Sequence, residues 1–185
     1  MTEYSTSIGN YINTDCNAVR QMYDDSCAIK SQQLILNSNG IGITEAQLCT
    51  EAFQNGWYKP GDGTPIGCIG NLIEMHGLQV ERKIGGTIDD LRFETTQGHN
   101  VIVGVDSGEL WHKGIHETFE DIIQGPRADH ALLVSGFAIN PLTGNEDILL
   151  TDPGTGELFA NYPVNQFEDA WDDSDYFMVS IQDDF

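Results

Sequence analysis

Apolar residues recur at helical spacing in three stretches of the first half of the chain. These stretches cover residues 27–36, 46–53 and 69–75. Apolar positions three and four residues apart lie on one face of a helix, where they can pack against a core. The sequence therefore predicts three helices between residues 26 and 77.

Polar residues and glycines bound each predicted helix. Thr44 and Gln47 have the spacing of a capping box, in which each side chain bonds the backbone N–H of the other residue. Serine and threonine favour the N-cap, and glycine favours the position just after the last turn. The expected N-caps are Ser26, Thr44 and Thr64 (with Pro65 at the first helical position), and the expected ends are Asn39-Gly40, Gly56 and His76-Gly77.

The second half of the chain is dominated by short apolar or alternating runs separated by turn residues, which is typical of β-strands. Helices followed by a set of strands favour an α+β fold with an antiparallel sheet. Residues 1–20 are polar and are expected to form a lead-in, whereas residues 21–185 are expected to form one domain. The predicted strands are 78–82, 101–105, 130–138, 147–151 and 176–181, with short helices over 87–93 and 164–171.

The charge of the chain is strongly negative. Its 185 residues include 29 acidic and 8 basic side chains, a formal net charge of −21. Nucleic-acid binding is not expected, because phosphate contacts need a surplus of lysine and arginine. A basic protein partner is compatible with this charge, and so is an acidic surface that only confers solubility.

The four cysteines show no C-x-x-C pair and no zinc-like spacing, so no metal site and no cofactor are expected. The N-terminal residues lack the charged and apolar regions of a signal peptide, and no window reaches the length of a membrane span. We therefore expect a cytoplasmic protein with reduced thiols, although secretion without a signal peptide stays open.

Cys27 is the candidate nucleophile. A thiol at the start of a helix lies beside unpaired N–H groups and the positive end of the helix dipole, which stabilise the thiolate. The alternative is that Cys27 is a small buried apolar residue, the usual role of a free cysteine.

His130 and Asp152 complete a possible catalytic set. His130 begins one predicted strand, and Asp152 lies at the end of the next. A hairpin of these strands would bring both residues to the same end of the sheet. A cysteine nucleophile needs a nearby base that a third group orients. Gln21, six residues before Cys27, can offer an amide N–H to an oxyanion. Taken singly, His130 could be a sheet-edge histidine and Asp152 a turn residue.

These blocks resemble the papain-like cysteine peptidases, and most of all the C39 family of double-glycine leader peptidases. The matching segments are QMYDDSCAIKSQQLIL, DHALLVSGFAI and ILLTDPGTGELFANYPVNQFEDAW. The resemblance implies a papain-like fold, with the nucleophile's helix packed on a C-terminal antiparallel sheet. It also implies that Gln21 stabilises the oxyanion, Cys27 attacks, His130 transfers protons and Asp152 orients His130. Ala28 stands where the family usually has a glycine.

The expected activity is hydrolysis of a peptide or isopeptide bond in a peptide or protein substrate, after small, Gly-Gly-like residues. Aromatic residues on loops can line a binding cleft, so Trp57 and Trp111, together with Ala28, are expected to contact the substrate. Two other readings stay open: a deamidase, transglutaminase or acyltransferase that uses the same acyl-enzyme, and a non-catalytic acidic module that binds proteins.

Overall fold

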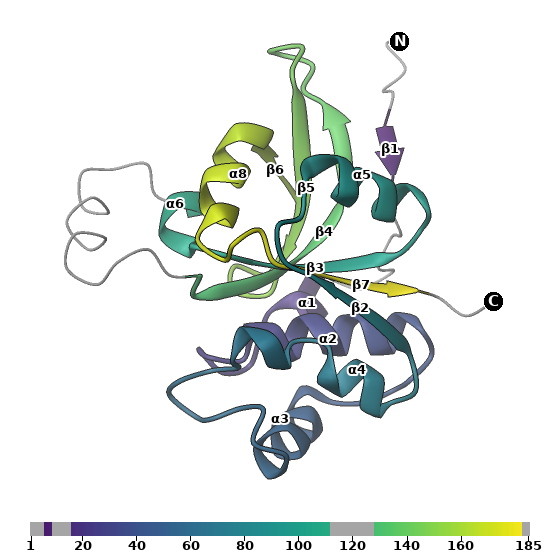
Figure 1. Ribbon diagram of the computed structural model, residues 1–185, viewed down its shortest axis with the longest axis vertical. Helices are drawn as coiled ribbons and strands as arrows, with labels where there is room; N and C mark the ends of the chain where they lie inside the picture. Colours follow the sequence, from purple (N-terminus) through teal and green to yellow (C-terminus); the bar gives the residue numbers. More distant parts are fainter. Residues whose placement is uncertain (1–5, 9–15, 112–127, 183–185) are drawn as a thin grey trace.

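A seven-stranded antiparallel sheet forms the middle layer of the protein (Figure 1). The computed structural model describes residues 6–8, 16–111 and 128–182. Six strands follow the order β2-β7-β3-β4-β5-β6, and β1 pairs with β4 beside them. The strands are β1 (Thr6–Ile8), β2 (Gln79–Lys83), β3 (Asn100–Val105), β4 (His130–Ile139), β5 (Glu146–Asp152), β6 (Glu157–Pro163) and β7 (Met178–Gln182).

The helices of the N-terminal half cover one face of this sheet (Figure 1). Their largest member, α2, is buried along most of its length and packs against β4, where Ser31 donates to the carbonyl of Ala131 at 3.3 Å. The sheet contributes residues such as Ile102 and Leu133 to the core on this side. The elements are α1 (Cys16–Val19), α2 (Cys27–Ser38), α3 (Glu45–Gln54), the 3₁₀ helix η1 (Ile66–Cys68) and α4 (Asn71–Met75).

Three further helices cover the opposite face: α5 (Ile88–Thr96), α6 (Ser107–Trp111) and α8 (Val164–Asp172). Val101 and Val103, which alternate with Ile102 along β3, belong to this second core together with Phe167 and Trp171. Alternation of this kind places successive side chains on opposite faces. Within the described ranges, no helix is both long and apolar enough to cross a lipid bilayer.

The α+β architecture and the predicted strands are confirmed, as is the capping box of Thr44 and Gln47 at the start of α3. The third predicted helix is wrong in its extent, because it is split into η1 and α4. Gly70, at φ 98°, interrupts it, and the N–H groups of Gly70 and Leu72 bond to the side chain of Gln32. Pro65 precedes η1 instead of occupying its first position.

In the part of the chain that the structure describes, four elements were not predicted from the sequence: β1, α1, α6 and β6. Strand β6 follows the Pro153–Gly156 turn and pairs with β5, which extends the hairpin that carries Asp152. Strand β1 and helix α1 lie within residues 1–20, so this lead-in contains regular structure. Its treatment as a segment separate from the domain of residues 21–185 stays a prediction.

Candidate active site

Cys27 is the first residue of α2. Its side chain is half-buried, and it lines a pocket of about 890 Å³. Ser26 occupies the N-cap position, but its hydroxyl makes no capping bond to the helix. The predicted N-cap position is therefore confirmed, but the predicted capping bond is wrong, because that hydroxyl bonds instead to Glu45 and to the carbonyl of Tyr23.

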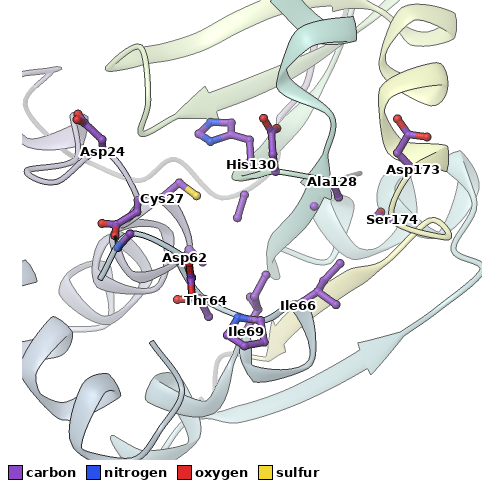
Figure 2. A pocket seen from close by; sticks show the side chains of 18 of the residues that line it. Asp24, Cys27, Asp62, Thr64, Ile66, Ile69, Ala128, His130, Asp173 and Ser174 are labelled. Carbon is purple, nitrogen blue, oxygen red and sulfur yellow. Dashed lines mark hydrogen bonds between the residues drawn. The ribbon is translucent and has the colours of Figure 1, made fainter. Parts of the chain in front are cut away.

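His130 begins β4 and faces the same pocket as Cys27 (Figure 2). Its backbone pairs with Val105 of β3, and its side chain is buried. The Cys27 side chain lies near enough to the imidazole to raise the pKa of His130. Thus the candidate nucleophile and a buried histidine of the sheet line the same pocket.

Asp152 ends β5, and the predicted pairing of its strand with that of His130 is confirmed. The His130 Nε2 atom lies 2.7 Å from Asp152 Oδ1. The same oxygen accepts the backbone N–H groups of Gly154 at 2.7 Å and Thr155 at 3.3 Å. Asp152 is therefore both a turn residue and the partner of the histidine, and the two readings of the sequence are compatible.

The surroundings of His130 and Asp152 favour the charged form of both side chains. Burial would lower the pKa of His130, but the hydrogen bonds and charges of Asp152 and Cys27 raise it to about 10. Burial would raise the pKa of Asp152, but His130 and the N–H groups of the following turn hold it below its usual value. Both directions favour a carboxylate on Asp152 beside an imidazolium on His130.

Trp111 covers this pair of side chains, a role that the sequence did not suggest. Its indole N–H donates to Asp152 Oδ2 at 3.1 Å, and its ring centroid lies 5.1 Å from that of His130. A Cβ atom on Gly154 would approach the His130 ring to 3.0 Å and the Trp111 ring to 3.2 Å. The absence of a side chain at Gly154 therefore gives both rings room to lie against Asp152.

The residues expected to contact substrate are placed differently from one another. Ala28 lines the pocket beside Cys27. Trp111 is not among the described residues that line it, and neither is Trp57, which is partly buried against the hydrophobic core. The expectation for Trp57 and Trp111 used only the general tendency of loop aromatic residues to line clefts. That tendency could not show which aromatic residues lie in the pocket.

Gln21 lies on the turn before Cys27, but its amide is occupied. The Nε2 atom donates to the carbonyls of Tyr23 at 2.8 Å and Asp24 at 2.9 Å. The Oε1 atom is buried and has no hydrogen-bond partner in the structure. In this arrangement Gln21 holds the turn, and its N–H groups do not point freely into the pocket.

Aspartates are the main charged residues along the pocket, which lies between the α2 side and the sheet side of the molecule. Figure 2 shows Asp173 and Ser174 across the pocket from Cys27. No lysine or arginine is among the described residues that line it. The lining aspartates are Asp24, Asp25, Asp62, Asp129, Asp173 and Asp175.

No protein-family model matches the sequence, and no curated protein matches it either. Solved structures do resemble the fold. A protein from Bacillus anthracis described as a C39-like peptidase has a TM-score of 0.69 at 15% identity, covering 96% of this chain and 98% of its own.

Two further peptidase structures are also similar. The peptidase domain of Streptococcus ComA, a bifunctional ABC transporter of a quorum-sensing pathway, has a TM-score of 0.60 at 14% identity, covering 89% of this chain and 96% of that one. A double glycine motif protease from an AMS/PCAT transporter, solved with its leader peptide, has a TM-score of 0.55 at 12% identity, covering 88% and 87%. The chain therefore has the papain-like fold of the C39 peptidases.

Proposed function

We propose that this protein is a cysteine peptidase in which Cys27 is the nucleophile, His130 the general base and acid, and Asp152 the carboxylate that orients His130. The observation that carries the proposal is that Cys27 and His130 line one pocket, while His130 Nε2 lies 2.7 Å from Asp152 Oδ1. A nucleophile, a base and an orienting group in hydrogen-bond reach are what covalent acyl transfer requires.

The reaction uses two proton transfers on His130. The Cys27 thiolate adds to the carbonyl carbon of the scissile bond, and the imidazolium of His130 then donates its proton to the departing amine. This leaves a thioester on Cys27 and a neutral imidazole. His130 next takes a proton from a water molecule, whose oxygen attacks the thioester, and the returned proton restores the ion pair as the carboxylic acid leaves.

Oxyanion stabilisation is assigned to the backbone N–H of Cys27 and to Gln21. The first N–H groups of a helix have no partner within the helix, so that of Cys27 is suited to this role. Gln21 can donate as well only after its amide leaves the carbonyl of Tyr23 or of Asp24. We propose that substrate binding draws the amide away from one of these carbonyls.

Small residues around the pocket support a preference for small substrate side chains. The lining includes Ala28, Gly63, Gly104 and Ala128. At Gly104 a Cβ atom would already approach Ile66 to 3.2 Å, so this wall is closely packed. We propose that residues of Gly-Gly type precede the scissile bond. One of the similar structures, a double glycine motif protease, contains a leader peptide, which is consistent with a peptide substrate here.

The negative lining favours a basic peptide or a basic protein partner. Carboxylates from both sides, such as Asp24 and Asp175, line the same pocket as Cys27. Complementary charge across an interface speeds association and discriminates between partners, and salt screens it. The substrate proposed is therefore a Gly-Gly-containing segment with lysine or arginine nearby.

A panel of four synthetic peptides tests this substrate proposal. The peptides carry Gly-Gly or Val-Val before the scissile bond and lysines or glutamates in the flanks, and mass spectrometry locates the cleavage. We expect cleavage after Gly-Gly with lysine flanks. Val-Val should lower kcat/KM by about 100-fold because of its bulk, and glutamate flanks by about tenfold at low salt.

The charge effect should shrink as salt is added, whereas the Gly-Gly effect should persist. Equal cleavage of all four peptides would contradict the substrate preference. Transfer of the acyl group to an added amine, with no hydrolysis, would identify an acyltransferase instead, because both reactions share the thioester. No thioester and no product with any peptide would favour the protein-binding module.

A further inference from the structure

A buried ion pair lies directly beneath the turn that leads to Cys27. Glu45, the first residue of α3, is 4% exposed, and Lys30 of α2 is 7% exposed. Their Oε2 and Nζ atoms are 3.6 Å apart, and Lys30 also donates to Gln33 Oε1 at 2.7 Å. Burying two charges costs more than burying apolar residues of the same size, so such a pair adds little net stability by itself.

The second carboxylate oxygen of Glu45 points to the turn. Oε1 accepts the backbone N–H of Met22 at 2.9 Å and the hydroxyl of Ser26 at 2.6 Å. Ser26 is fully buried and immediately precedes Cys27. One carboxylate therefore holds both ends of the segment 22–26. Hydrogen bonds to a charged acceptor are stronger than those between neutral groups.

Other contacts fix the surroundings of this segment. The backbone N–H of Gln21 donates to the carbonyl of Pro153 at 2.8 Å, one residue after Asp152. Asp25 accepts the Tyr58 hydroxyl at 2.7 Å and the N–H of Gly61 at 2.5 Å, on the pocket wall. The turn is thus tied to the sheet at one end and to the pocket wall near the other, and Glu45 holds it from inside.

We propose that Glu45 is a positioning residue for Cys27: its carboxylate fixes segment 22–26 so that the thiol meets His130. This inference rests on the proposed peptidase function. Glu45 is not among the described residues that line the pocket, so it acts through the turn and not on the substrate. Lys30 supplies the charge that allows this carboxylate to be buried.

Two double variants separate the hydrogen bonds of Glu45 from its charge. Lys30→Met removes the buried ammonium from both, and Glu45 is then changed to Gln or to Leu. The Gln amide oxygen can still accept from Met22 and Ser26, whereas Leu cannot. The rate of Cys27 alkylation by iodoacetamide at pH 6 is measured, as are kcat and KM for a Gly-Gly peptide, with near-ultraviolet circular dichroism as a check of the fold.

In the Leu variant we expect iodoacetamide to alkylate Cys27 about tenfold more slowly than in the parent. We also expect a lower kcat with little change in KM, because small displacements of reacting groups slow the reaction strongly. The Gln variant should stay within about threefold of the parent. Equal alkylation rates in the two folded variants would overturn the proposal. Glu51→Gln is the matched control. Glu51 lies on the same helix as Glu45, but its carboxylate pairs with His76, so this substitution should change neither rate.

Ser26→Ala gives an independent test if a double variant fails to fold, since it leaves the ion pair intact. We expect about a threefold slower alkylation of Cys27, and an unchanged rate would overturn the proposal. The alkylation readout does not require turnover. A rate that depends on Glu45 in a protein that cleaves no peptide would therefore refute the peptidase function while supporting the positioning role.

Discussion

Peptide hydrolysis by the Cys27→Ala protein is expected to be about 10⁴-fold slower or worse than that of the parent. The substitution removes the sulfur that shares the pocket with His130 and that forms the thioester in the proposed mechanism. A loss of that size corresponds to about 5.5 kcal/mol of transition-state stabilisation. Removing the nucleophile of a catalytic set costs about as much as removing the whole set.

The measurement is single-turnover hydrolysis of the best peptide of the panel. The fold should be retained, because alanine favours helices and Cys27 is the first residue of α2. Cys68→Ala is the matched control, since Cys68 is also a half-buried free thiol. A Cys27→Ala protein that still hydrolyses the peptide would exclude Cys27 as the nucleophile.

Asp152→Asn is expected to lower kcat by about 10²-fold or more and to move the alkaline limb of the pH–rate profile to lower pH. The carboxylate of Asp152 is one of the groups that raise the pKa of His130 to about 10, against the opposing effect of burial. Without its negative charge, the pKa of His130 falls. The imidazolium form of His130 is then lost at a lower pH as the pH rises.

The geometry adds a second cost. An amide that keeps its oxygen toward His130 directs its NH₂ group at the indole N–H of Trp111, so two donors face each other. The pH dependence of kcat/KM from pH 5 to 10 measures the effect, with Asp147→Asn as the control. Asp147 is a buried carboxylate of the same strand that bonds to Asn140 instead. An alkaline limb that does not move would show that Asp152 does not control the charge of His130.

The pairing of His130 with Asp152 could be predicted because it depends on local signals. One apolar strand begins with a histidine, and the next strand ends in Asp-Pro-Gly. Once these strands form a hairpin, both residues lie at the same end of the sheet. The start of α2 at Cys27 was predictable for a similar reason, since the apolar spacing of the helix begins there. Both are consequences of pattern and chain order.

Contacts between distant segments could not be predicted in this way. Ser26 looks like an N-cap in sequence, but its hydroxyl bonds to Glu45, nineteen residues further along. Trp111 looks like a loop aromatic, but it lies on Asp152, forty-one residues away. Gly70 divides the third predicted helix because its N–H bonds to Gln32 on another helix. In each case tertiary structure overrides a local preference.

The overall charge of −21 could not show where the carboxylates gather. The structure places six aspartates around the pocket that contains Cys27 and His130. The acidic composition therefore has a specific location as well as a general effect on solubility. A basic partner and a cytoplasmic location stay predictions.

The pH dependence of Cys27 alkylation by iodoacetamide tests the central claim most directly, with mass spectrometry to separate Cys27 from the other cysteines and His130→Ala as the comparison. If Cys27 and His130 form an ion pair, the parent reacts readily at pH 6, where ordinary thiols are almost fully protonated, and His130→Ala abolishes this reaction. If Cys27 in the parent reacts no faster at pH 6 than Cys68, or if His130→Ala leaves its rate unchanged, the ion pair is absent and the proposed active site is contradicted.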